Sequence, residues 1–418
     1  MKNKTLVAIL SVFIFCIGFL GGALGITYIT LPTTDTLTVS DDIFYSMGDN
    51  DSIAVSDEIS APVDGVVSVH FLELGNKYTG DCTYIKVGKD IDILIDCGSK
   101  SNSIATVSSY LNNFITDGTL EYVIITHAHQ DHYAGFSTTT KVNSIFDLYE
   151  CENIITFTRT DQKSVTTDTL DIFSPNKGVS SRNTLYDNFL RELLDEKTNG
   201  ANVYTANTFR EENLNGIKVL DEQNAITLQI LDSKYYATDS SGDAHSENDY
   251  SVCTLISHGE KDFLFTGDLE EDGERALIDL NPTLGKVKLY KAGHHGSKTS
   301  SSPELLEVIE PEIICVCCCA GSSEYTSKVE NQFPTVEFIA NISKYTTNVY
   351  VTTMCVNYDN DDFVSFNGNI VVISTSVQSI DTAVYCSASK EVLKDSQWFK
   401  DKRLELCKQK NNFHSSWL

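Results

Sequence analysis

The chain has 418 residues, of which 41% are hydrophobic and 21% are charged, a balance that excludes an intrinsically disordered protein and allows a sizeable core. This length accommodates one large layered domain with appendages, or about two or three average domains. The formal net charge of −27 repels polyanions and argues against extended nucleic acid as a partner, although a small phosphate ester at a metal centre is still allowed.

Residues 1–32 form a distinct N-terminal unit. Lys2 and Lys4 precede an uncharged run that ends near Thr34 and is long enough to span a bilayer as a helix. This run is longer than the apolar region of a typical cleaved signal, although Ala23-Leu24-Gly25 offers small residues for cleavage. We expect a single-pass transmembrane anchor with the body outside the cell; cleavage would instead make the body a secreted protein.

The next segments predict a linker and then a layered body. Residues 33–64 are rich in Asp, Ser and Thr and predict an acidic polar linker. Residues 65–380 alternate between the patterns of strands and helices, which predicts an α/β fold with buried sheets. The expected strands cover residues 66–73, 83–87, 91–95, 122–126, 217–220, 226–231, 250–257, 262–266, 313–318, 348–353 and 369–374.

Helices are expected at residues 104–115, 185–196, 271–280 and 303–309. The last has a clear start, since Ser302 suits the N-cap and Pro303 the first helical position. Residues 381–418 are expected to form a C-terminal appendage, with a short strand and then a basic amphipathic helix over about 390–410.

Twelve cysteines would suggest disulfides in an exported chain, but their positions argue against a dense framework. Cys315, Cys317, Cys318 and Cys319 crowd one apolar run, and neighbouring strand positions point to opposite faces. We expect most cysteines to be small buried hydrophobes. A metal site at Cys317–Cys319 is the alternative, although it has no second ligand pair at the usual spacing.

The segment that carries chemistry is residues 124–135, Ile-Ile-Thr-His-Ala-His-Gln-Asp-His-Tyr-Ala-Gly. A buried strand ends there and is followed at once by His127, His129, Asp131 and His132. Alternation along an extended chain places His127 and His129 on one side, where two imidazoles can hold one ion. Asp131 and His132 lie further on and are displaced enough to serve a second ion.

This segment resembles the His-x-His-x-Asp-His motif of the metallo-β-lactamase superfamily, and further motifs follow in the order of that family. Residues 265–268, Phe-Thr-Gly-Asp, resemble the strand-end aspartate that bridges the two metals. Residues 291–298, Lys-Ala-Gly-His-His-Gly-Ser-Lys, resemble the later histidine motif. The His-His-Gly-Ser-Lys run, its short distance from Asp268 and residues 248–251 resemble the competence-protein (ComEC-type) branch.

The resemblance implies an αββα sandwich of two mixed sheets flanked by helices, with two Zn²⁺ ions, or Mn²⁺ or Fe in their place. Ligand chemistry assigns His127 and His129 to the first ion. Asp131, His132 and His294 are assigned to the second ion, and Asp268 bridges the two. Asp131 therefore also takes part in catalysis.

His295 is expected to donate a hydrogen bond to the substrate, although the roles of His294 and His295 are interchangeable at this stage. Lys298 is expected to attract an anionic substrate, against the alternative of a solvated surface lysine. Asp81 and Asp96 are expected to orient the histidines from behind. Many relatives place a third histidine on the first ion in a Gly-His-Thr context that this chain lacks, and His245 is the candidate replacement.

These features predict a membrane-anchored hydrolase that cleaves a phosphodiester or phosphoester by attack of a metal-bound hydroxide. The expected substrate is small or linked to the cell wall. A lactonase or β-lactamase is the catalytic alternative, because the same chemistry attacks carbonyl groups. A non-catalytic surface scaffold is the alternative from another class, because one fold hosts many functions.

Overall fold

The computed structural model describes residues 54–56, 63–139, 142–162, 184–375 and 382–418. The predicted anchor at residues 1–32 and most of the predicted linker at 33–64 lie outside these ranges. Within them, no helix combines the length and the apolar character that a membrane crossing requires.

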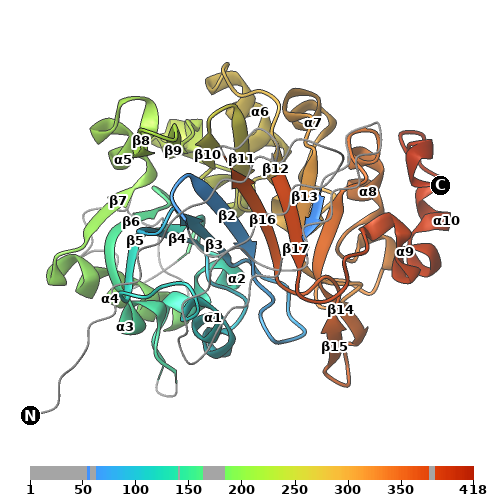
Figure 1. The fold of residues 1–418 in the computed structure, drawn as a ribbon, viewed down its shortest axis with the longest axis horizontal. Coiled ribbons are helices and arrows are strands. Elements are labelled where there is room, and N and C mark those ends of the chain that lie inside the picture. The colour runs from blue at the N-terminus through green and yellow to red at the C-terminus, as the bar shows by residue number, and fades with distance from the viewer. Residues whose placement is uncertain (1–53, 57–62, 140–141, 163–183, 376–381) are drawn as a thin grey trace, which may run out of the picture.

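Two mixed β-sheets form the centre of the molecule (Figure 1). The first sheet has nine strands, which are, in spatial order, β1 (Ala54–Ser56), β17 (Thr382–Cys386), β16 (Ile370–Thr375), β2 (Val66–Phe71), β3 (Thr83–Val87), β4 (Ile91–Ile95), β5 (Thr119–Ile125), β6 (Glu150–Thr156) and β7 (Asn202–Thr205). The second has eight, which are β15 (Asp362–Ser365), β14 (Val349–Asn357), β13 (Ile313–Ala320), β12 (Leu289–Lys291), β11 (Lys261–Phe265), β10 (Thr254–His258), β9 (Ile226–Ile230) and β8 (Ile217–Asp221).

Helices cover the outer faces of both sheets. The helices of the described residues are α1 (Ile104–Leu111), α2 (Gln130–Tyr133), α3 (Ile145–Leu148), α4 (Thr184–Asn199), α5 (Ala206–Glu212), α6 (Glu271–Leu280), α7 (Pro303–Ile309), α8 (Val336–Ile342), α9 (Gln397–Lys402) and α10 (Leu404–Cys407), of which the short α2 belongs to the loop that follows β5. In Figure 1, α1 and α3 lie on one side of the sheets and α6 and α7 on the other. The layer order is helix, sheet, sheet, helix, as the sequence predicted.

Strand β13 shows how alternation divides the core. Ile313, Cys315 and Cys317 join the cluster that lies between the sheets, whereas Ile314 and Cys318 join the cluster beneath the outer helices. All cysteines that the structure describes are free thiols, and all except Cys355 are buried. The prediction of small buried hydrophobes is confirmed for these cysteines. The groups with metal-ligand spacing among the described residues contain no cysteine.

Most expected elements are present within a few residues of their predicted ends, and Ser302 caps α7 by accepting a hydrogen bond from the Leu305 amide. Two expectations are wrong. The strand expected at 250–257 begins only at Thr254, because Glu247–Tyr250 form a 3-10 turn. The basic helix expected at 390–410 is broken into α9 and α10, because Arg403 leaves helical geometry and its side chain is buried.

The topology brings the motifs to one edge of the sandwich. Strands β4 and β5 are parallel neighbours in the first sheet, and β11 and β12 are parallel neighbours in the second. The carboxyl ends of parallel neighbours meet at one edge, where open α/β sheets bind their ligands. The loops that follow these four strands carry Asp96, the histidine segment, Asp268 and the His294-His295 pair.

Candidate metal centre

The histidine loop follows β5 and is held against the loop that follows β4. The Asp81 amide donates to the Asp131 carbonyl at 3.0 Å, and the Cys97 amide donates to the His132 carbonyl at 2.8 Å. At Gly98 a Cβ atom would lie 1.5 Å from the Asp131 carbonyl oxygen, so only glycine allows this approach. Backbone contacts therefore hold Asp131 and His132 in place independently of their side chains.

His127 and His129 form the first group of donors. Nε2 of His127 lies 3.0 Å from Nδ1 of His129. On its other side, His127 Nδ1 lies 3.1 Å from the Thr126 hydroxyl and 3.4 Å from the Ser251 hydroxyl. The Thr126 hydroxyl donates to Asp96 at 2.7 Å and so accepts from His127, which leaves His127 Nε2 free to bind a cation.

Asp131, His132, Asp268 and His295 form the second group, with ligand atoms within 4.8 Å of one another. His132 Nε2 lies 3.1 Å from Asp268 Oδ2, and His295 Nε2 lies 3.3 Å from the same oxygen. His295 Nε2 is also 3.5 Å from Asp131 Oδ2. Two imidazole nitrogens and two carboxylates thus converge on one point.

Buried acceptors orient the two rings of the second group from behind. His132 Nδ1 donates to Asp96 Oδ2 at 2.7 Å. His295 Nδ1 donates to the Cys317 carbonyl at 3.0 Å and lies 3.1 Å from Asp81 Oδ1. Such outer partners fix the tautomer and turn Nε2 towards a metal. The structure therefore places Asp81 and Asp96 where the sequence expected orienting groups.

His294 and His295 point in different directions because both have left-handed backbone, with φ of 45° and 56°. His294 Nδ1 lies near the Thr299 hydroxyl and Glu270 carboxylate, at 3.3 and 3.4 Å. Its Nε2 lies 3.8 Å from Asp268 Oδ2. The structure thus differs from the sequence-based assignment, since His295, and not His294, stands with Asp131 and His132.

The donor set fits a divalent cation. His132 Nε2, His295 Nε2 and Asp268 Oδ1 are buried and have no hydrogen-bond partner among the described residues. Unpaired buried polar atoms are costly, and the two imidazole nitrogens converge on the Asp268 carboxylate, so the cluster indicates a ligand. Imidazole and carboxylate are the ligands that zinc and its neighbours prefer.

The charges of the centre are strongly coupled. Burial would raise the pKa of Asp268, but His132 and His295 hold it well below its ordinary value. Burial would lower the pKa values of His132 and His295, but Asp268 raises both well above the ordinary value. Burial, with the neighbouring histidines, lowers the pKa of His127 well below its ordinary value. His127 is therefore neutral, and a cation at the second group must displace protons.

Comparison with known proteins identifies the family. Residues 75–141 and 190–319 match the family described as the metallo-beta-lactamase superfamily. The chain belongs to this superfamily. It is a metallo-β-lactamase-fold hydrolase with a His and Asp metal site.

Two curated proteins show distant similarity to this superfamily member. ComE operon protein 3 of Bacillus subtilis (strain 168) is 30% identical over 125 residues, which cover 30% of this chain and 15% of that protein. Recombination protein 2 of Haemophilus influenzae is 37% identical over 71 residues, which cover 17% of this chain and 9% of that protein. The chain thus matches less than a sixth of the length of either relative.

Solved structures of similar chains have low TM-scores. The metallo-beta-lactamase fold protein YhfI from Bacillus subtilis has a TM-score of 0.34 at 11% identity and covers 69% of this chain and 96% of its own. Igni18, a metallo hydrolase from Ignicoccus hospitalis, has a TM-score of 0.35 at 15% identity and covers 72% of this chain and 98% of its own.

The remaining residues singled out in the sequence lie at the edge of this metallo-β-lactamase centre or outside it. Lys298 is exposed, and no ion pair joins it to the centre within the described ranges. His245 is exposed in the loop before Glu247. Among the described residues, the groups with metal-ligand spacing do not include His245.

Several site residues gave no signal in the sequence. The buried carboxylate of Glu247 accepts from the amides of Asp161 at 2.6 Å and Ala128 at 3.4 Å, which braces the histidine loop. Burial raises the pKa of Glu247 to about 8. Tyr325 donates from its hydroxyl to Asp131 Oδ2 at 2.9 Å. These contacts join segments far apart in the chain, so no local pattern announces them.

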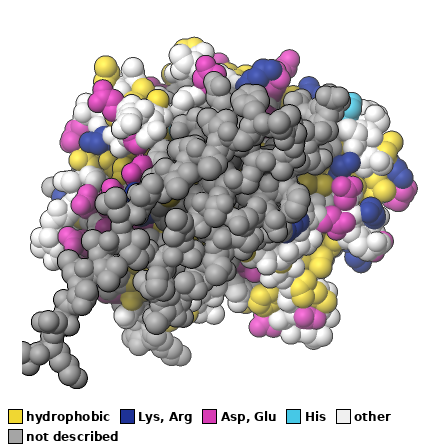
Figure 2. Space-filling view, viewed as in Figure 1, with side chains coloured by type: hydrophobic (Ala, Val, Ile, Leu, Met, Phe, Trp, Pro, Cys, Tyr) yellow, Lys and Arg dark blue, Asp and Glu magenta, His cyan; other side chains and the backbone are white. Residues whose placement is uncertain are grey.

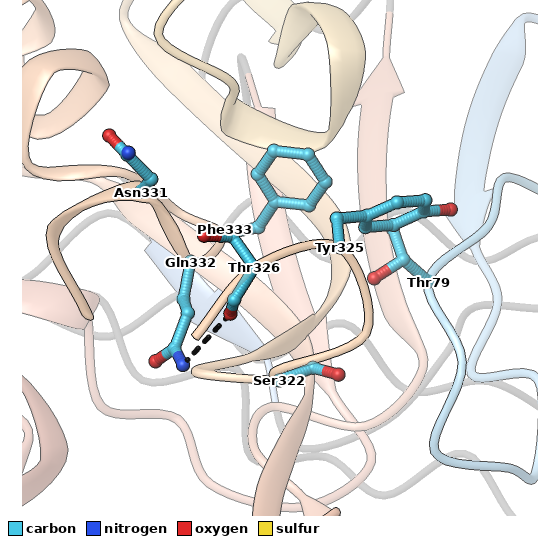
Figure 3. Close-up of a pocket in the computed structure, with 7 residues that line it drawn as sticks. All are labelled: Thr79, Ser322, Tyr325, Thr326, Asn331, Gln332 and Phe333. Carbon is cyan, nitrogen blue, oxygen red and sulfur yellow. Dashed lines mark hydrogen bonds between the residues drawn. The ribbon is translucent and has the colours of Figure 1, made fainter. Parts of the chain in front are cut away.

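A small depression lies beside Tyr325 (Figure 3). Its lining residues are Thr79, Ser322, Tyr325, Thr326, Asn331, Gln332 and Phe333. Because the Tyr325 hydroxyl reaches Asp131, the depression adjoins the metal centre.

Proposed function

We propose that this metallo-β-lactamase-fold protein is an exported, membrane-anchored hydrolase that cleaves a phosphodiester or another phosphoester. The observation that carries the proposal is the position of Asp268 between two groups of donors. Its Oδ2 lies 3.1 and 3.3 Å from the second group, at His132 and His295. It also lies 3.9 and 3.8 Å from His127 and His294. A carboxylate in this position suits two neighbouring cations.

The distances suggest how the side chains divide between two ions. His127 Nε2 and His129 Nδ1 would hold the first ion, and His294 Nε2 would be the third donor that the sequence lacked at the family position. Asp131, His132 and His295 would hold the second. Bound Zn²⁺, or Mn²⁺ or Fe, would supply Lewis acidity and lower the pKa of water. The protein itself fixes the donor atoms and keeps His127 neutral.

Charge favours a small substrate or one linked to the cell wall. The net charge of −27 opposes a long polyanion. On the described part of the face in Figure 2, Lys and Arg are interspersed with Asp and Glu and form no continuous basic track. The exposed Lys298, three residues after His295, would attract a single phosphate group. One relative is named for recombination, a process on nucleic acids, whose backbone is a phosphodiester.

The uncharged N-terminal run after Lys2 and Lys4 supports the location proposed here. Its length suits a single membrane span, and the two lysines favour the cytoplasmic side for the N-terminus. The metal centre would then act outside the cell.

The test is turnover of bis(p-nitrophenyl) phosphate by the full chain in mild detergent, with and without added Zn²⁺ or Mn²⁺. His127→Ala and Asp268→Ala should abolish turnover. The exposed His414 and Asp279 supply matched controls, His414→Ala and Asp279→Ala, which should retain it.

Two outcomes would overturn the proposal. Absence of turnover in a folded, metal-loaded protein would reject phosphoester cleavage, and lactones and β-lactams would then be assayed. A folded protein that holds no metal after dialysis against buffer with trace Zn²⁺ would reject hydrolysis and favour a surface scaffold.

A further inference from the structure

The segment between β13 and α8, residues 321–335, places two aromatic rings beside the metal centre. The Phe333 ring lies 5.8 Å from the ring of His294 and 5.8 Å from that of His295, between ring centroids. The Tyr325 ring lies 5.6 Å from the Phe333 ring and is 57% exposed. An exposed aromatic face beside catalytic groups is available to a substrate.

The chemistry of the depression is neutral. Figure 3 shows the rings of Tyr325 and Phe333 with the hydroxyl of Ser322 and the amide of Gln332 around them. Its lining side chains carry hydroxyl, amide or aromatic groups, and none of them is charged. Flat apolar faces combined with a few neutral polar groups suit an uncharged ring and offer no partner to a second charge.

A buried arginine from the C-terminal segment holds this loop. Arg403 is 1% exposed, and its guanidinium donates to the Pro334 carbonyl at 3.2 Å and the Gln332 carbonyl at 3.1 Å. These two carbonyls flank Phe333. The guanidinium also lies 4.5 Å from the centre of the Trp398 ring. A buried charge is costly, so its use on backbone carbonyls indicates that the loop position matters.

The same end of the loop is also tied to the histidine motif. The Thr335 amide and hydroxyl both bond to the Gly296 carbonyl, at 2.9 and 3.1 Å. The Gly321 amide donates to the Phe333 carbonyl at 2.7 Å, which closes the loop on itself. The loop is therefore fixed relative to His294 and His295.

We propose that residues 321–335 form the specificity wall of the active site. Phe333 and Tyr325 contact an uncharged ring that the substrate carries beside its scissile bond. Tyr325 also positions Asp131, and Arg403 holds the wall in place. This inference rests on the proposed hydrolase function.

The test compares bis(p-nitrophenyl) phosphate with ethyl p-nitrophenyl phosphate on the full chain. Both release the same leaving group, and only the first carries a second ring. In Phe333→Leu, the ratio of kcat/KM for the first substrate over the second should fall about 3-fold to 10-fold from its wild-type value, through KM. Referring the ratio to the wild type cancels the intrinsic reactivity of each ester. Phe146→Leu, a buried change beside Phe136, is the matched control and should keep the ratio.

Two further variants separate the roles. Tyr325→Phe keeps the ring and removes the bond to Asp131, so kcat should fall about 10-fold for both substrates with the ratio unchanged. Arg403→Met should lower the ratio as Phe333→Leu does. Arg191→Met, at an exposed arginine on α4, should leave the ratio unchanged.

The outcomes are distinguishable from failure of the proposed function. If the wild type cleaves neither ester, the hydrolase proposal itself fails. If the wild type cleaves both and a folded Phe333→Leu keeps the wild-type ratio, the specificity wall is rejected. Urea midpoints establish that each variant is folded, and if Arg403→Met unfolds, Phe333→Leu and Tyr325→Phe decide.

Discussion

The Asp96 carboxylate offers a direct test of the metal centre, because it determines which nitrogen of His132 carries the proton. Its Oδ2 accepts from His132 Nδ1 at 2.7 Å, and its Oδ1 accepts from the Thr126 amide at 2.8 Å. In Asp96→Asn, one of these oxygens becomes an NH₂ group. Whichever way the amide is turned, its NH₂ group faces either His132 Nδ1 or the Thr126 amide. Two hydrogen-bond donors then point at each other.

The clash is relieved when the NH₂ group faces His132 and the ring proton of His132 moves from Nδ1 to Nε2. Nε2 is the nitrogen that faces Asp268 at 3.1 Å. Nε2 would then have no lone pair for a cation. Loss of such an orienting partner lowers metal affinity about 10-fold to 100-fold, or about 1.4 to 2.8 kcal/mol. Competition with a chromophoric chelator at pH 7 measures the affinity for Zn²⁺.

The matched control is Asp117→Asn, at an exposed aspartate whose oxygen accepts from the Thr119 amide. It should bind Zn²⁺ as the wild type does. Wild-type affinity in a folded Asp96→Asn protein would refute the reasoning that Asp96 sets the tautomer of His132.

Three more predictions concern stability. Burial raises the pKa of Glu274 from 4.5 to about 7. The Glu274 side chain therefore contributes most to the free energy of unfolding below pH 4.5, and this contribution is lost as the pH rises through 7. Glu274→Gln should gain about 3 kcal/mol in free energy of unfolding relative to the wild type between pH 4.5 and 8; a constant difference in urea denaturation would contradict this. Gly98→Ala places a Cβ 1.5 Å from the Asp131 carbonyl and should cost more than about 3 kcal/mol, whereas Gly285→Ala meets nothing within 4 Å and should be nearly neutral by thermal melting. Removal of Zn²⁺ with a chelator should lower the melting temperature, because Zn²⁺ at about 100 times its dissociation constant adds about 2.7 kcal/mol to the free energy of unfolding. An unchanged melting temperature would show that the folded protein does not bind Zn²⁺.

Local patterns were sufficient for much of the fold. The strands predicted at 83–87 and 91–95 and the helices predicted at 271–280 and 303–309 have the same bounds as β3, β4, α6 and α7. Apolar periodicity and a proper N-cap are properties of neighbouring residues, so the sequence displays them. The prediction of one continuous tail helix failed because Arg403 lies buried against carbonyl groups about 70 positions away, and no local pattern shows these partners.

The sequence by itself determined the family and the centre's ligand types, because His127, His129, Asp131 and His132 stand in one short segment after a strand. Only the tertiary structure decided which of His294 and His295 joins Asp131. The left-handed backbone at both positions, and the acceptors behind each ring, set the direction of their Nε2 atoms. Likewise, only folding brought Tyr325 to the centre and Arg403 to the loop beside it. The residue types of the ligands can be read from the sequence, but the orientation of each ligand depends on partners that the fold brings to it.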